Sequence, residues 1–170
     1  MTRLKIALTY NLKKSAAEEH AEFDTPATIE RLSAILEGLG HRVIPLDVSG
    51  SISRFLVRIQ RIAPELVFNL AEGERGPFRE AIYPALFEQL GIAHTGSSAG
   101  TLALCLDKAL AKSVVAAAGV ATPRGFIIHD DPGESLETDE PALDRMIHAD
   151  DKLPVIVKPN YEGSSKGITR

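Results

Sequence analysis

The chain of 170 residues has no tryptophan, one cysteine and no excess of positive charge. The single cysteine, Cys105, excludes an internal disulfide and is typical of proteins from a reducing compartment. Its neighbours are both leucines, which predicts a buried thiol. The net charge of −4 lacks the basic footprint of a nucleic-acid-binding protein, so we expect no nucleic-acid partner.

Long apolar runs are also missing from the sequence. The N-terminal run at residues 6–8 is too short for a signal peptide, and no window reaches the apolar length of a transmembrane helix. We therefore expect a cytoplasmic protein with no membrane partner. The histidines are scattered without metal-ligand spacing, and no Ser/His/Asp or Cys/His arrangement is recognisable.

The first 96 residues alternate between short apolar segments and segments of helical periodicity. Strands are expected at residues 4–10, 41–46, 66–70 and 91–95. Helices are expected at residues 26–39, 52–59 and 83–90. Thr25 is a candidate N-cap of the first helix, and Pro84 is expected in the first turn of the third. This order predicts an α/β fold with a Rossmann-like parallel sheet and helices on both faces, although no GxGxxG fingerprint follows the first strand.

Residues 97–170 have a different pattern, so we divide the chain into domains at 1–96 and 97–170. Ser98 and Asp107 are candidate N-caps of two short helices. Further strands are expected at residues 125–128 and 154–158. Between them, an acidic exposed loop is expected at 129–139 and a helix at about 142–148.

A loop rich in glycine and serine follows the apolar segment that ends at Lys158. Its residues are Glu162, Gly163, Ser164, Ser165, Lys166 and Gly167. Small residues let backbone N–H groups approach phosphate oxygens closely, and lysines supply the matching charge. The loop is not a Walker A motif, which requires GxxxxGK[ST] before a helix. A phosphate-binding loop and an ordinary turn between two antiparallel strands are both compatible with these residues.

Two further charged segments are candidate sites. Lys108 falls in the first turn of its helix, where an anionic ligand would offset the unfavourable helix dipole; the alternative is a solvated face shared with Lys112. Glu72 and Arg75 follow an apolar strand, where open α/β sheets place ligand loops. Glu72 is a candidate contact for a substrate ammonium, and Arg75 or Arg79 for a carboxylate. The alternative is a charged surface turn.

Taken in order, these segments resemble the N-terminal half of an ATP-grasp ligase of the D-alanine–D-alanine ligase-like group. The motifs that carry the resemblance are VFNLAEG (67–73), GIAHTGS (91–97), LCLDK (104–108) with Lys112, GVATP (119–123) and PVIVKPNYEGSSKG (154–167). The resemblance implies a pre-ATP-grasp domain at 1–96. Linker helices and the start of an α+β ATP-grasp subdomain then occupy 97–170.

The resemblance also implies roles for individual residues. Lys108 and Lys158 would contact the phosphates of ATP, the loop of residues 162–167 would close over the triphosphate, and Ser164 would place the first substrate and the reacting phosphate. The implied reaction phosphorylates a carboxylate, and an amine then attacks to give an amide, ADP and phosphate. Mg²⁺ would bridge the phosphates. Its ligands are expected after residue 170, so no metal ligand is assigned in this chain.

Two departures from the family pattern lie on the substrate side. Residues 10–25 lack the glycine pattern that accompanies a substrate-binding glutamate, for which Glu18, Glu19 or Glu22 is only a loose match. The family's histidine–glycine pair is replaced by Glu72-Gly73. These changes argue against D-alanine as the substrate and leave a small amino-acid-like molecule, with Glu72 and Arg75 as candidate contacts.

The strand expected from residue 168 has only three residues before the sequence stops. We therefore expect a fragment of a longer ligase that is inactive alone and binds ATP weakly at best. The alternative is a non-catalytic binding module that keeps the ATP-grasp N-terminal fold, and the DNA after codon 170 distinguishes the two. The resemblance also implies a homodimer through the N-terminal region.

Overall fold

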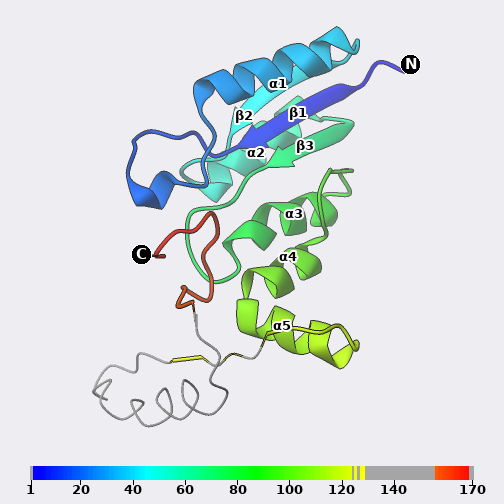
Figure 1. Cartoon of the computed structure of the whole chain (residues 1–170). Helices are drawn as coiled ribbons and strands as arrows, with labels where there is room; N and C mark the ends of the chain where they lie inside the picture. The colour runs from blue at the N-terminus through cyan, green and yellow to red at the C-terminus, as the bar shows by residue number, and fades with distance from the viewer. Residues whose placement is uncertain (1, 124, 126, 129–155, 169–170) are drawn as a thin grey trace.

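The computed structural model describes residues 2–123, 125, 127–128 and 156–168. Three parallel strands form its sheet: β1 (Lys5–Tyr10), β2 (Arg42–Asp47) and β3 (Leu66–Leu70). Their order is β2-β1-β3, with β1 in the centre (Figure 1). A central strand covered on both faces is buried along its length, and β1 is accordingly buried at four consecutive residues, of which the first three are apolar.

Five α-helices and one 3₁₀ turn accompany this sheet in the described residues. They are the 3₁₀ turn η1 (Glu18–His20), α1 (Pro26–Gly38), α2 (Ile52–Ile62), α3 (Arg79–Gln89), α4 (Ala99–Leu106) and α5 (Lys108–Ala117). The three predicted N-caps are confirmed. Thr25, Ser98 and Asp107 each accept a hydrogen bond from a backbone N–H in the first turn of the following helix.

Helices cover both faces of the sheet, as predicted. On one face, side chains of α2 and α3 pack on the strands around Ala7 and Val67. Phe55 and Phe87, both nearly fully buried, fill the space between these helices and the sheet. On the other face, where α1 lies, Ile6 and Leu8 are buried (Figure 1). The two layers of helices leave the carboxyl ends of the strands free to carry loops, which is where the site lies.

The predicted fourth strand, residues 91–95, is wrong in extent although its position is right. Only His94 forms a bridge, parallel to Val67, with backbone bonds from Val67 N–H to Ala93 and from Thr95 N–H to Val67. Gly96, at φ +92°, then turns the chain away from the sheet. The segment therefore extends the sheet by a single residue pair.

The start of α3 also differs from the prediction. The helix begins at Arg79 rather than Tyr83, so Pro84 lies inside it and not in its first turn. The Arg79 N–H bonds the Gly76 carbonyl, and the Arg79 side chain is buried, which anchors the helix one turn earlier. This shift matters because it brings Arg79 and Glu80 to the site.

Cys105 is exposed, so the predicted buried thiol is wrong. The adjacent Leu106 is buried instead, at 6% exposed, because α4 turns that face toward the protein. No helix in the described part of the chain is long and apolar enough to span a membrane.

The C-terminal segment forms no strand in the residues described. Residues 156–158 form no strand, and residues 160–161 and 164–167 form turns. Residues 125 and 127–128, from the other predicted strand, form no strand either. The acidic loop predicted at 129–139, the helix at 142–148 and residues 126 and 154–155 of the two predicted strands lie outside the described residues.

Candidate functional site

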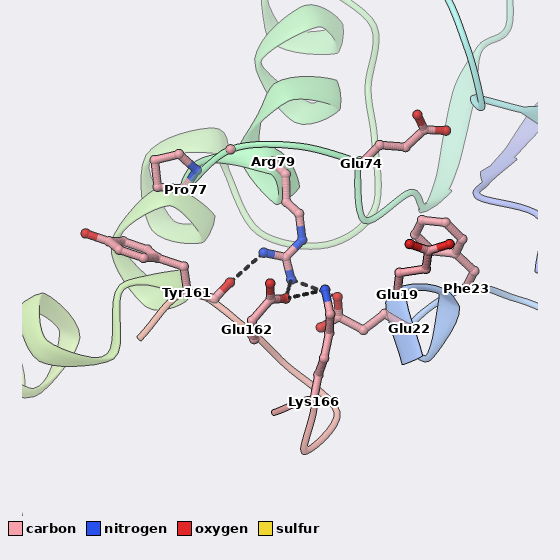
Figure 2. Close-up of a pocket in the computed structure, with 11 residues that line it drawn as sticks. Glu19, Glu22, Phe23, Glu74, Pro77, Arg79, Tyr161, Glu162 and Lys166 are labelled. Atoms are coloured by element: carbon pink, nitrogen blue, oxygen red, sulfur yellow. Dashed lines mark hydrogen bonds and ion pairs between the residues drawn. The ribbon is translucent and has the colours of Figure 1, made fainter. Parts of the chain in front are cut away.

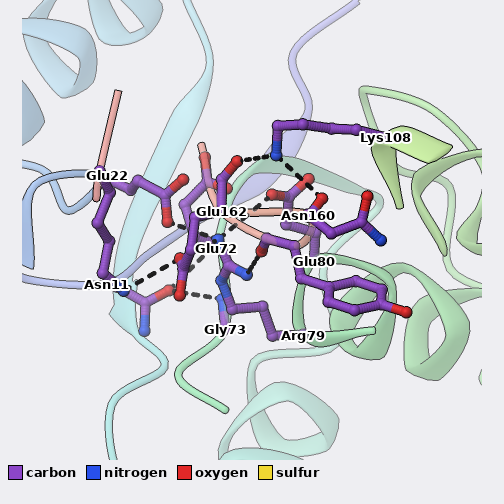
Figure 3. Close-up of polar contacts among 11 residues, drawn as sticks. Asn11, Glu22, Glu72, Gly73, Arg79, Glu80, Lys108, Asn160 and Glu162 are labelled. Carbon is purple, nitrogen blue, oxygen red and sulfur yellow. Dashed lines mark hydrogen bonds and ion pairs between the residues drawn. The ribbon is translucent and has the colours of Figure 1, made fainter. Parts of the chain in front are cut away.

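The site begins where β1 and β3 end. Asn11, the first residue after β1, is fully buried, and its Oδ1 accepts hydrogen bonds from the N–H groups of Glu72 (3.0 Å) and Gly73 (3.1 Å). Gly73 has φ +72°, and its backbone passes against the Arg79 carbonyl. Asn11 therefore fixes the loop after β3 and the direction in which Glu72 leaves it (Figure 3).

Four carboxylates line one cavity of about 290 Å³ beside this loop. We call it the acidic cavity, and the carboxylates belong to Glu22, Asp24, Glu72 and Glu80. Burial, and then the charges of Glu80 and Glu22, raise the pKa of Glu72 to about 7. Burial also raises the pKa values of Glu80 and Asp24. Carboxylates crowded in this way favour a bound cation, because a positive charge relieves their mutual repulsion.

Arg79 is the cation that the protein itself supplies to these carboxylates. Its guanidinium lies 2.7 Å from Glu22 and 3.8 Å from Glu80. It also reaches the C-terminal segment, where it lies 3.3 Å from Glu162 and donates to the Tyr161 carbonyl (Figure 2). One buried side chain therefore connects the acidic cavity with a segment more than 80 residues away in the sequence.

A second cavity, of about 330 Å³, lies beside Arg79. Glu22 lines both cavities. Residues 161–167, which we call the Gly/Ser loop, contribute Tyr161, Glu162 and Lys166 to the second cavity. Lys166 pairs with Glu162 at 3.0 Å, so two cations share that carboxylate.

Lys108 stands at the first position of α5 and points to the same loop. Its ammonium donates to the Asn160 carbonyl at 3.0 Å and to the Glu162 carbonyl. Burial, and then the positive charge of Lys158, lower the pKa of Lys108. Two lysines close enough to repel each other suit a polyanionic ligand, which would bind both charges.

Asn160 holds the loop against the start of α5. Its side chain donates to Asp107 (2.8 Å) and accepts from the Ala109 N–H (3.0 Å), while its carbonyl accepts from the Lys108 N–H (3.2 Å). The N–H of Leu110 and then the Asn160 amide lower the pKa of Asp107. This contact sets the place of Lys108 relative to the loop.

We expect Asn160→Ala to lower the free energy of unfolding by about 1–2 kcal/mol, because it removes two side-chain hydrogen bonds. Asn160→Asp keeps an acceptor for Ala109 but sets a second carboxylate against Asp107. Its loss of stability should therefore exceed that of the alanine variant at pH 7 and shrink at acidic pH. Urea unfolding at both pH values measures this, and wild-type stability in both variants would contradict the assigned role.

The structure brings most of the sequence-predicted residues together. Gly163 packs against the Glu22 carboxylate, and the Gly167 N–H donates to Glu18 at 2.6 Å. Ser164 and Ser165 are exposed and have positive φ angles, of 47° and 62°. Their predicted roles, with those of the other loop residues and the two lysines, stay predictions.

Lys158 and Arg75 are two of the predicted residues that line neither cavity. Lys158 is exposed, although its charge acts on Lys108. Arg75 is exposed and lines neither cavity, whereas Arg79, the alternative to it, is buried at the centre of the site. No group of three His, Cys, Asp or Glu side chains within the described residues is placed to hold a metal ion.

Sequence reasoning missed Asn11, Glu80 and Asn160. A signal existed for Asn11, because a polar residue directly after the central strand of a parallel sheet lies at the edge where ligand loops gather. The position of Glu80 at the site depends on where α3 starts, and that of Asn160 depends on a contact between segments 51 residues apart. Neither carries a local pattern.

Comparisons with known proteins agree on one group. The D-alanine–D-alanine ligase of Moorella thermoacetica is 32% identical over 136 residues, which cover 80% of this chain and 41% of that protein. The corresponding ligase of Caulobacter vibrioides is 36% identical over 135 residues, which cover 78% of this chain and 36% of that protein. The chain thus spans about two fifths of the length of these curated relatives. No protein-family model matches it.

Solved structures show the same fold. A crystal structure of the D-alanine–D-alanine ligase from Bacillus anthracis has a TM-score of 0.70 and 23% identity, with 98% of this chain and 48% of that chain covered. A structure of the same enzyme complexed with ATP has a TM-score of 0.67 and 22% identity, with 93% and 48% covered. The relatives and the structures together confirm the resemblance drawn from the sequence: the chain is similar to the N-terminal half of D-alanine–D-alanine ligase-like ATP-grasp proteins.

Proposed function

We propose that this chain forms part of an ATP-dependent carboxylate–amine ligase, with a pre-ATP-grasp domain at 1–96 and the start of an ATP-grasp subdomain at 97–170. The proposal rests on one observation. At the carboxyl edge of the parallel sheet, Arg79 contacts both a carboxylate of the acidic cavity and Glu162 of the lysine-bearing Gly/Ser loop. Amino acids bring an ammonium, and ATP brings a polyanion. The site offers each of them a matching set of charges.

The substrate side of this proposal rests on the acidic cavity. Glu72, supported by Glu22 and Glu80, would hold the ammonium of a small amino-acid-like substrate. Binding of that cation would keep Glu72 ionised at neutral pH, since a nearby positive charge lowers the pKa of a carboxyl. Arg75 remains a candidate carboxylate contact only if the substrate extends toward the surface, where that side chain lies.

The nucleotide side rests on the lysines and the Gly/Ser loop. ATP, when bound, supplies the phosphoryl group that activates the substrate carboxylate. Lys108 and Lys158 would bind its phosphates, and the loop from Glu162 to Gly167 would cover them and exclude water. Lys108 now donates to loop carbonyls, so these contacts would be exchanged for phosphate oxygens on binding. Ser164 would orient the substrate carboxylate toward the reacting phosphate, and Mg²⁺ would neutralise the phosphates through ligands outside this chain.

The test uses the full natural protein that carries this sequence. We expect Lys108→Met to weaken MgATP binding, measured by calorimetry, at least about tenfold, which corresponds to about 1.4 kcal/mol. Arg61→Met, a charge change on an exposed position of α2, should leave the affinity unchanged. Phosphate release from ATP should further depend on an added amino acid.

Equal MgATP affinity in the wild type and Lys108→Met would overturn the role of Lys108. Absence of MgATP binding in the full protein would overturn the ligase proposal and favour a non-catalytic module that keeps the fold. MgATP binding without any amino-acid-stimulated phosphate release would remove the substrate half of the proposal.

A further inference from the structure

The Gly/Ser loop is held to the first domain by side chains rather than by regular secondary structure. Its own backbone bonds are two turns, from the Lys166 N–H to Gly163 and from the Ile168 N–H to Ser165. Ser164 and Ser165 both lie in the left-handed region of φ, which is unfavourable for residues with a Cβ. Such a conformation persists only where surrounding contacts determine it.

Arg79 supplies the most buried of these contacts. Its side chain is 8% exposed, and that of Glu22 is 9% exposed, so their 2.7 Å ion pair is largely shielded from water. Glu22 thereby fixes the direction of the guanidinium. The nitrogen that pairs with Glu22, Nη2, also lies 3.3 Å from the Glu162 carboxylate, and Nη1 donates to the Tyr161 carbonyl. The guanidinium thus joins Glu22 of the first domain to two residues of the loop.

The remaining contacts of the loop with the first domain are weaker anchors. The bond from the Gly167 N–H to Glu18 is exposed. Lys166 pairs with Glu162, but both residues belong to the loop itself. Lys108 and Asp107, at the start of α5, bind Asn160 at the base of the loop, but α5 follows the first domain in the chain. Arg79 is therefore the most buried side-chain anchor that holds the loop beside the second cavity.

We propose that Arg79 is a positioning residue that latches the Gly/Ser loop onto the first domain, with Glu22 as its fixed support and Glu162 as the releasable partner. Release of Glu162 would let the loop move away and admit ligands to the second cavity, which Tyr161, Glu162 and Lys166 line. Re-formation of the pair would close the loop over that cavity. The relevance of the latch to catalysis rests on the proposed function, but the latch itself does not.

Hydrogen–deuterium exchange of the 170-residue protein, without ligands, tests the latch. In Arg79→Met we expect the amides of Lys166 and Ile168 to exchange at least tenfold faster, while the amides of β1 keep their wild-type rates. Arg79→Lys keeps one positive charge and should restore part of the protection. Arg61→Met removes an arginine from a helix as well, but an exposed one, and should change neither segment.

Glu162→Gln serves as the second variant, because its side chain is 30% exposed and its loss should not unfold the protein. It should accelerate exchange at the same loop amides severalfold and leave β1 unchanged. The latch would be overturned if the loop amides exchanged at wild-type rates both in Glu162→Gln and in a folded Arg79→Met. It would also be overturned if exchange accelerated equally in the loop and in β1 in both variants. None of these outcomes depends on ATP, so failure of the latch and failure of the ligase proposal are told apart.

Discussion

Replacement of Gly73 by alanine is expected to lower the free energy of unfolding by about 2–4 kcal/mol. Gly73 has φ +72°, a region that costs residues with a Cβ roughly 1–2 kcal/mol. A Cβ added there would lie 2.3 Å from the Arg79 carbonyl oxygen and 2.8 Å from its carbon. Overpacking of this kind typically costs about 1–3 kcal/mol more.

The backbone at this point has little freedom to relax. The Asn11 side chain accepts hydrogen bonds from the N–H groups of both Glu72 and Gly73. The carbonyl that an added Cβ would meet belongs to Arg79, the first residue of α3. A shift that relieved the overlap would therefore move Arg79 or break the bonds to Asn11. We expect Gly73→Ala also to displace Arg79 from its partners.

Gly76→Ala provides the matched control. Gly76 has a similar φ of +88°, but an added Cβ would meet no atom within 4 Å. The control should therefore lose only the conformational part, roughly 1–2 kcal/mol. Urea unfolding of the two variants measures the difference. Equal losses would show that the close approach to Arg79 carries no cost and that the loop after β3 adapts freely.

The fold was largely predictable because its signals are local. The caps at Thr25, Ser98 and Asp107 act within one helical turn, and the apolar run of β3 lies within five residues. The predicted fourth strand has the same apolar character but forms one bridge only, because Gly96 turns the chain away. Local patterns indicate which segments are apolar, not how far their pairing extends.

The site was less predictable because its contacts join distant segments. Arg75 and Arg79 are four residues apart, and the sequence offers both as carboxylate ligands. Only the early start of α3 directs Arg79 inward and leaves Arg75 exposed. The partners of Arg79 lie 57 residues before it and 82 residues after it, a pairing that no local pattern encodes.

The pH dependence of stability should change in Glu72→Gln. The pKa of Glu72 rises from an ordinary 4.5 to about 7 in the folded protein, first through burial and then through the charges of Glu80 and Glu22. Between these values the folded state binds more protons than the unfolded state, so the free energy of unfolding falls as the pH rises. Above pH 7 the wild type carries the whole penalty of the ionised carboxylate.

Glutamine keeps the shape of the side chain and stays neutral at every pH, so the variant should escape this penalty. We expect Glu72→Gln to be more stable than the wild type by roughly 1–3 kcal/mol at pH 8, after allowance for solvent screening, and to differ little at pH 4.5. Urea unfolding across this range gives the two curves. Removal of the charge should also weaken any affinity of the acidic cavity for an ammonium.

Glu74→Gln is the matched control, because Glu74 is the exposed carboxylate two residues along the same loop. Its pH curve should run parallel to that of the wild type. Parallel curves for Glu72→Gln as well would mean that Glu72 titrates alike in the folded and unfolded chain. In that case the carboxylates around the cavity do not strain one another, and the electrostatic reason for a bound cation would be lost. Converging curves below pH 7 would instead support Glu72 as a group that is fully ionised at neutral pH only when a cation is bound beside it.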